Sequence, residues 1–285
     1  MSLSIRAALR IVGDVAVYRL RRLEMANLGG AVTIGLVLGL APGDLALRVA
    51  VAVVLNLLVY LNNDYYDVGQ DLTATGRDRA RTEFLAAHRA EALLAQGALA
   101  VVMLGLAAIA GGGLWLVAAT GAGICAAYSA RLKRVPFLDV LAMIAWGGVM
   151  PLVGAPADRL VGWLMAGQLA LFSGVFESMQ VRRDWAEDRD AGVRTTAVVL
   201  GPRRTAWLTR GLVAVAALYA AAVLHPIAAG LAALALALPV TDDAAKDWTR
   251  MKLLLGVTWL VICGLVVANG GTAGLWLHVS LGAGG

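Results

Sequence analysis

The sequence predicts an all-α, polytopic membrane protein of about nine transmembrane helices that forms a single domain over residues 1–285. Three observations support this prediction. Apolar residues make up 60% of the chain, against roughly 45–50% in soluble domains, and the mean hydropathy is +0.77. The apolar residues gather in runs close to the ~20 residues that a helix needs to cross a bilayer. Charged residues lie between those runs, and most of them lie on one side of the predicted membrane.

The breaks between the apolar runs carry turn or charge signals, such as Gly111-Gly112-Gly113 and His225-Pro226. Nothing in the chain has the alternating pattern of a strand. The 33 glycines are scattered through apolar stretches, which suits close packing of helices in lipid. We therefore place the spans at residues 25–41, 45–62, 91–110, 113–128, 137–154, 160–181, 206–223, 226–240 and 252–269.

The basic residues test this span count and predict the orientation. With nine spans, 22 of the 24 Lys and Arg residues lie on one side and only Arg48 and Arg159 lie on the other. Cytoplasmic loops carry an excess of Lys and Arg. We therefore expect an integral protein of the cell inner membrane with a cytoplasmic N-terminus and an outward C-terminus. An inner face against anionic lipid explains the pI near 9.6 without any nucleic-acid partner.

Two acidic clusters follow the second and sixth spans. The first reads Asn63-Asp64-Tyr65-Tyr66-Asp67-Val68-Gly69-Gln70-Asp71, in which Asn63, Asp67 and Asp71 share one helical stripe and Asp64 lies one step round. In the second, Asp184 and Asp188 are spaced i, i+4. Both clusters lie at the cytoplasmic end of an even-numbered span, four spans apart. This placement suggests two related four-helix halves with a ninth helix added.

Clustered carboxylates near a bilayer predict a bound cation. Like charges at i, i+4 destabilise a helix, and ionisable groups near the membrane are costly. Hard oxygen ligands select magnesium or calcium over zinc, and magnesium commonly joins one or two carboxylates to phosphate oxygens. The clusters therefore predict a diphosphate site, in which metal and nearby Arg and Lys stabilise a leaving diphosphate. The alternative interpretation is that these are solvated charges at helix ends.

At these residues the sequence resembles the UbiA superfamily of intramembrane prenyltransferases. The motif Asn-Asp-x-x-Asp-x-x-x-Asp of that family is matched by the first cluster, and its Asp-x-x-x-Asp motif by the second. Residues 192–201 resemble the Gly, basic and Thr residues and the apolar run that often follow. Residues 128–134 resemble the Tyr-Ser-x-x-Leu-Lys segment of many members. Together these matches cover most of the chain.

The resemblance implies a fold, a cofactor and a set of site residues. The expected fold is nine helices around a central cavity, in which two Mg²⁺ ions join the aspartate motifs to a polyprenyl diphosphate. The implied metal ligands are Asp64, Asp67, Asp71, Asp184 and Asp188, with Asn63 in support. The implied diphosphate ligands are Arg131, Lys133, Arg183 and Arg77. Arg22 and Asn27 resemble residues that many members place around the acceptor, and the remaining pocket candidates are Tyr128, Glu177 and Gln180.

One segment departs from the family pattern. After the first motif, many members carry an Arg-Pro-rich segment, whereas residues 75–84 keep the arginines and contain no proline. We therefore expect a different cap over the site. Inference of the acceptor from related enzymes is correspondingly weakened.

The leading hypothesis is an Mg²⁺-dependent enzyme that transfers a prenyl group from its diphosphate to a small-molecule or lipid acceptor. A terpene cyclase of the UbiA type, which needs no acceptor, is the main alternative. A secondary transporter would place its carboxylates near the bilayer midplane, and an intramembrane aspartyl protease would place two Asp deep within spans. Both clusters here lie at span ends, which disfavours the last two classes. The sequence identifies neither the acceptor nor the length of the prenyl chain.

Overall fold

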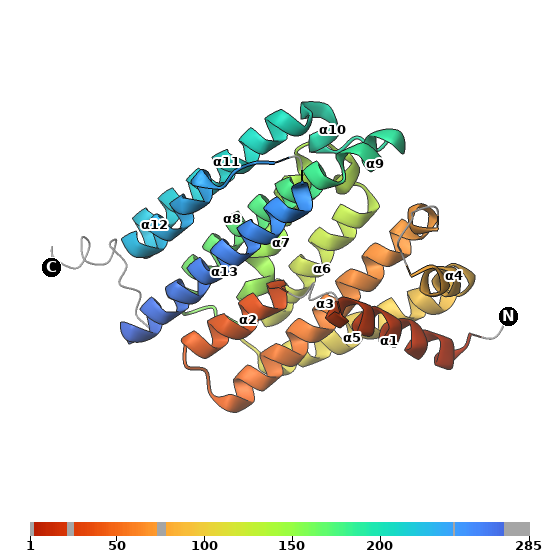
Figure 1. Cartoon of the computed structure of the whole chain (residues 1–285). Helices are drawn as coiled ribbons and strands as arrows, with labels where there is room; N and C mark the ends of the chain where they lie inside the picture. Colours follow the sequence, from red (N-terminus) through yellow and green to blue (C-terminus); the bar gives the residue numbers. More distant parts are fainter. Residues whose placement is uncertain (1–2, 22–25, 73–77, 242, 271–285) are drawn as a thin grey trace.

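The computed structural model describes residues 3–21, 26–72, 78–241 and 243–270, and every regular element within these ranges is a helix (Figure 1). This confirms the all-α prediction. Each predicted apolar run corresponds to a helix, and the bounds of these helices are α2 (Ala26–Val37), α3 (Pro42–Asp71), α5 (Arg89–Ala110), α6 (Leu114–Ala130), α7 (Leu138–Leu152), α8 (Leu160–Arg183), α11 (Pro202–Tyr219), α12 (Pro226–Leu234) and α13 (Ala244–Ala268).

The lengths of these helices differ. Among the described residues, five helices are long and apolar enough to cross a membrane: α3, α5, α8, α13 and α11, the last continued by a π-helical turn to Leu224. The others, α2, α6, α7 and α12, are shorter apolar helices. The count of nine complete spans therefore stays a prediction.

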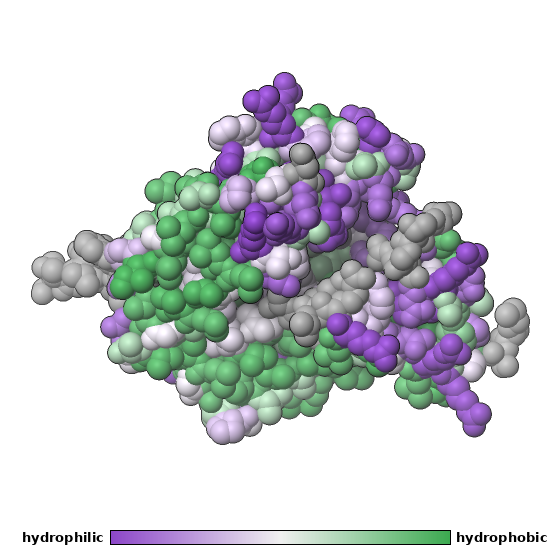
Figure 2. All heavy atoms as spheres, in the orientation of Figure 1, coloured by the Kyte–Doolittle hydropathy of each residue, from purple (hydrophilic) through white to green (hydrophobic). Residues whose placement is uncertain are grey.

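Four helices lie outside the predicted spans: α1 (Ile5–Arg21), α4 (Arg79–Ala87), α9 (Trp185–Asp190) and α10 (Thr196–Leu200). Figure 1 places all four on the right of the view, at the end of the bundle where α3, α6 and α8 end. Hydrophilic atoms gather at this end, and the left of the molecule is hydrophobic (Figure 2). The polar elements therefore mark one membrane face, on which both acidic motifs lie.

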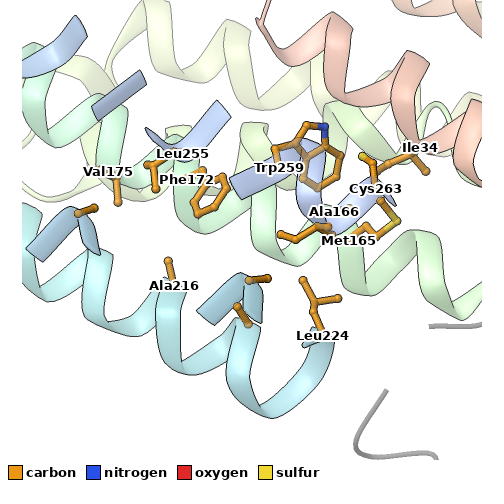
Figure 3. Close-up of a cluster of buried hydrophobic side chains, with 14 of the residues drawn as sticks. Ile34, Met165, Ala166, Phe172, Val175, Ala216, Leu224, Leu255, Trp259 and Cys263 are labelled. Atoms are coloured by element: carbon orange, nitrogen blue, oxygen red, sulfur yellow. The ribbon is translucent and has the colours of Figure 1, made fainter. Parts of the chain in front are cut away.

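Two hydrophobic clusters form the core. One joins α3, α5, α6 and α7 through buried side chains such as Leu55, Met103 and Trp146. The other joins α8, α11 and α13 through Phe172, Leu255 and their neighbours, which Figure 3 shows facing one another. Helix α7 contributes to both clusters. The two halves expected from the motif positions thus share a helix and are not separately packed units.

Helices α7 and α8 pack closely because small residues face each other. A Cβ placed on Gly147 would lie 2.1 Å from the Cβ of Ser173, and one on Gly174 would lie 2.5 Å from Cγ1 of Ile144. Neither contact is sterically possible, so only glycine permits this approach. The pair positions the end of α8, which carries the second motif, next to the start of α7.

Helix α13 packs against α2. The indole Nε1 of Trp259 donates to Oγ1 of Thr33 at 3.0 Å, and Ile34 of α2 is fully buried in the cluster that includes α13. A buried indole N–H needs such a partner. The last long helix therefore packs directly against the first apolar one.

Candidate active site

The first motif lies in the last turns of α3. At 1.5 Å per residue, the 30 residues of α3 extend about 45 Å, which exceeds the ~30 Å hydrocarbon core of a bilayer. The helix therefore reaches into the polar region, where its acidic end is less costly. Asn63 and Asp67 are partly buried there, whereas Asp64 and Asp71 are buried.

Lys133 connects the first motif to the loop after α6. It lies in a short 3₁₀ helix, Leu132–Arg134, and its Nζ forms an ion pair with Oδ1 of Asp67. Burial lowers the pKa of Lys133 to about 8, and the charges of Asp188 and Asp64 oppose this change. Since Asp188 belongs to the second motif, this lysine lies within electrostatic reach of both motifs.

The second motif begins where α8 ends. Asp184 caps α8 and forms an ion pair with the adjacent Arg183 at 2.7 Å. Asp188 lies one turn further, in α9. Burial and the charge of Asp184 together raise the pKa of Asp188 to about 6, against the opposing effect of a hydrogen bond from the side chain of Thr195. The two carboxylates therefore repel each other, as a cation site requires.

A buried aspartate that the sequence analysis did not identify supports this region. Asp139, at the start of α7, is fully buried, and its carboxylate accepts from the backbone N–H of Thr196 at 2.6 Å and from the Thr196 hydroxyl. The same hydroxyl accepts from the N–H of Phe137, whose φ is +69°. These bonds join the α6–α7 connection, which carries Lys133, to the segment after the second motif.

Asp64 is held by two arginines. Its Oδ1 accepts from Nη2 of Arg19 at 2.5 Å, and its Oδ2 accepts from Nη1 of Arg81 at 2.6 Å. Arg19 lies on α1 and Arg81 on α4, and both side chains are only 9% exposed. The carboxylate thus has a guanidinium at each oxygen.

Two of the predicted pocket residues meet between α6 and α8. The hydroxyl of Tyr128 donates to Oε1 of Glu177 at 2.8 Å, and Glu177 is buried. Gln180, by contrast, is exposed, so of the two polar pocket candidates on α8 only Glu177 is buried.

The other predicted residues are less closely engaged. Asn27 is partly buried, and Arg131 is exposed. Arg22 and Arg77 lie outside the described residues. Within the described ranges, no three His, Cys, Asp or Glu side chains lie close enough together to hold one metal ion. The motifs therefore share one end of the bundle and one lysine, without a preformed carboxylate centre.

Comparison with known proteins identifies the family. Residues 28–253 match the UbiA prenyltransferase family, and this match covers most of the 285 residues. The chain belongs to this family. Both aspartate motifs of the UbiA chain fall within the matched residues, and the family together with the long apolar helices indicates an integral membrane protein.

Solved UbiA structures share the fold. A structure from a study of digeranylgeranylglyceryl phosphate synthase aligns with a TM-score of 0.73 at 16% identity, covering 93% of this chain and 99% of that one. A UbiA homologue from Archaeoglobus fulgidus bound to DMAPP and Mg²⁺ aligns with a TM-score of 0.64 at 18% identity, covering 90% and 86%. The same homologue bound to GPP and Mg²⁺ gives 0.65 at 17% identity, covering 92% and 99%. No curated protein matches the chain.

In this UbiA chain, the sequence analysis missed Arg19 and Asp139, and it included Arg81 only among the arginines of residues 75–84, without its partner Asp64. The two arginines belong to the many basic residues predicted to face anionic lipid on the inner side, and the sequence does not distinguish them from the others. Asp139 lies in the first turn of a helix, where an acidic residue is ordinarily explained by the helix dipole. The partners of these three residues, Asp64 and Thr196, could be identified only from the folded structure.

Proposed function

We propose that this chain is an Mg²⁺-dependent prenyltransferase that moves a prenyl group from its diphosphate to a small-molecule or lipid acceptor. The observation that carries the proposal is the position of Lys133, which pairs with Asp67 of the first motif and lies within electrostatic reach of Asp188 of the second. A lysine at this place could bind the phosphate oxygens of a substrate whose metal ions are held by the carboxylates of the two motifs. The family and the ligands named for its solved homologue, DMAPP and GPP with Mg²⁺, support the same assignment.

The residues of the two motifs suit magnesium. Their donors are carboxylate oxygens and the amide oxygen of Asn63, which are the hard ligands that Mg²⁺ prefers. The residues proposed to hold two ions are Asp67, Asp71, Asp184 and Asp188, with Asn63 in support; the family motif also includes Asp64, whose carboxylate is already paired with two arginines. When bound, Mg²⁺ would neutralise the charge that builds up on the departing diphosphate.

The side chains of the protein have their own roles in the proposed reaction. The phosphate oxygens that the metal ions do not bind would be bound by four basic residues: Lys133, Arg131, Arg183 and Arg77. The allylic carbon–oxygen bond breaks, its electron pair goes to the diphosphate, and the acceptor attacks the carbon and then loses a proton. Tyr128 would present its ring to the developing cation, with its hydroxyl held by Glu177. Arg22 and Asn27 are the proposed acceptor contacts.

The orientation belongs to the same proposal. The basic excess favours a cytoplasmic face for both motifs and for the N-terminus, with the C-terminus outside. The soluble prenyl diphosphate head would then enter from the cytoplasm, and its tail would lie among lipid-facing helices.

The decisive experiment measures diphosphate release and product mass with the purified full-length protein, a series of prenyl diphosphates, Mg²⁺ and a panel of acceptors. We expect Asp67→Asn and Asp184→Asn to lower turnover by about a hundredfold or more. Asp190→Asn is the matched control, since Asp190 is exposed and pairs only with the adjacent Arg189 in the described structure. Release that is unchanged in both motif variants would reject the enzymatic proposal.

The same assay separates transfer from cyclisation. Incubation with a prenyl diphosphate alone should give little product, because transfer consumes an acceptor. A cyclic hydrocarbon or terpene alcohol formed without acceptor would instead assign the chain to the cyclase alternative.

A further inference from the structure

Asp64 differs from the other motif aspartates in its surroundings. It is 3% exposed, and each carboxylate oxygen already accepts a short, charge-assisted hydrogen bond, one from Arg19 and one from Arg81. Asp67 pairs with a single lysine, and Asp184 is about a third exposed. The oxygens of Asp64 are therefore less available to an added ligand than those of Asp67 or Asp184.

Aromatic rings hold both guanidinium groups in place. The guanidinium of Arg81 lies 4.0 Å from the centroid of the Tyr18 ring, and that of Arg19 lies 4.4 Å from the centroid of Tyr60. A planar guanidinium can lie over the face of a ring while its N–H groups donate within the guanidinium's own plane. Each arginine is thus fixed between an aromatic face and one oxygen of Asp64.

The network joins three helices that are separate in the sequence. Arg19 and Tyr18 come from α1, Tyr60 and Asp64 from α3, and Arg81 from α4. A further contact supports the α1–α4 pair, since the guanidinium of Arg10 lies 3.8 Å from the ring of Phe84. Figure 1 shows α1 and α4 beside the end of α3 that carries the motif. Asp64 is the common partner of both peripheral helices.

We propose that Asp64 is a positioning residue, which ties α1 and α4 to the end of α3, and that it does not bind the metal. Removing the Asp64 carboxylate would take a counter-charge away from two buried guanidinium groups, which is strongly unfavourable. Metal binding then belongs to the remaining motif residues. This inference rests on the proposed function for its catalytic meaning, but its test requires no turnover.

The test compares two double variants that leave the net charge unchanged. Asp64→Asn with Arg81→Gln removes the proposed tether, and Asp67→Asn with Lys133→Gln removes a proposed ligand together with its ion-pair partner. Binding of Mn²⁺, a paramagnetic substitute for Mg²⁺, is measured by electron paramagnetic resonance on the full-length protein without prenyl diphosphate. We expect the first variant to bind within about threefold of the wild type and the second to bind about tenfold or more weakly. Equal losses in the two variants would make Asp64 a metal ligand and overturn the proposal.

Hydrogen exchange provides the second measurement. In the Asp64 double variant, amides of residues 5–21 and 79–87 should exchange about tenfold faster, while those of α13 stay unchanged and so report an intact fold. Unchanged exchange in α1 and α4 would reject the tether. Should the double variant fail to fold, Arg81→Lys replaces it, since lysine keeps the charge but loses the planar group over Tyr18; faster exchange in α4 with unaltered Mn²⁺ binding is then expected. Arg79→Gln is the control, because Arg79 is 78% exposed and pairs with Glu83 on its own helix.

The two readouts also separate this inference from the proposed function. If the well-folded wild type shows no prenyl transfer, the proposed function is rejected, but faster exchange in the Asp64 double variant would still support the tether. Normal transfer with unchanged exchange in the Asp64 variant would reject the tether alone.

Discussion

Lys133 is the residue whose charge lies within electrostatic reach of both motifs. Burial holds the pKa of Lys133 near 8, which is well below the ordinary value for lysine. The ammonium group is therefore mostly charged at neutral pH and loses its proton at mildly alkaline pH. A pH effect on substrate capture follows, because kcat/KM reports the ionisations of the free enzyme.

We predict that kcat/KM for the prenyl diphosphate falls above pH about 8, approaching a tenfold loss per pH unit. The neutral amine can neither pair with Asp67 nor bind phosphate oxygens. In Lys133→Arg the alkaline limb should disappear, because arginine stays charged. The measurement is the rate of diphosphate release at low substrate across this pH range. An alkaline limb that persists in Lys133→Arg would assign it to another group.

At this scale the sequence identified the residues of the two motifs, whose chemical roles stay a prediction, and missed several of their partners. Asp67, Lys133 and Asp188 were predicted from spacing and a family motif, and the structure brings them within electrostatic reach of one another. Arg19 and Asp139 could not be predicted in the same way. Their roles depend on contacts 45 and 57 residues away in the chain, and no local spacing records such distances.

Among the elements, α7 and α10 are joined beside the site by hydrogen bonds between Asp139 and Thr196. Asp139 accepts from the N–H and the hydroxyl of Thr196 and from the N–H of Val140. A carboxylate has enough lone pairs for all three donors. An asparagine at this position would direct an NH₂ group toward at least one donor.

We predict that Asp139→Asn lowers the free energy of unfolding by about 2–4 kcal/mol, the cost of charge-assisted bonds lost in a buried site. Thermal unfolding of the purified protein in detergent measures the change. Thr196→Ser, which keeps the hydroxyl donor, should stay within about 1 kcal/mol of the wild type. Equal stability of Asp139→Asn and the wild type would contradict the proposed role of this carboxylate.

The sequence predicted the apolar helices well and the polar ones poorly. Every predicted span has a helix, because a run of about twenty apolar residues has few other structures available in lipid. Helices α1, α4, α9 and α10 were not predicted, since they are short or rich in arginine and their pattern is also that of a solvated loop. The departure noted in residues 75–84 corresponds in part to α4, which begins after Asp78, whose side chain accepts from the N–H of Arg81.

The charge distribution has a consequence for the whole molecule. Arg48, one of the two basic residues predicted on the outer side, is buried at the far end of α3, where it pairs with Asp44 at 2.9 Å and donates to the carbonyl of Val153. Its charge is thus neutralised within the fold. The exposed basic residues remain concentrated at the end that carries both motifs.

We predict that Asp158→Cys, in the exposed loop before α8, reacts with a membrane-impermeant maleimide added to intact cells. Asp190→Cys, exposed beside the second motif, should react only after the cells are permeabilised. The wild type is the control, because both native cysteines, Cys125 and Cys263, are buried. The opposite labelling pattern would reverse the proposed orientation.

For the molecule as a whole, composition and charge were sufficient to predict a helical membrane protein. They were insufficient for the number of complete spans, because α2, α6, α7 and α12 are too short to be judged by length alone. The two related halves stay a prediction, and they are not separate packing units, since α7 packs into both core clusters. Shared packing of this kind depends on side-chain shape, which motif positions do not record.

The contact between Trp259 and Thr33 implies an order of assembly during synthesis. The ribosome makes Trp259 226 residues after Thr33. The Thr33 hydroxyl and the face of α2 that is buried against α13 therefore lack this partner until α13 is inserted. Translation must therefore pass α13 before the contact between α2 and α13 can form. A chain arrested before that point would present an open seam to lipid and to quality-control proteases.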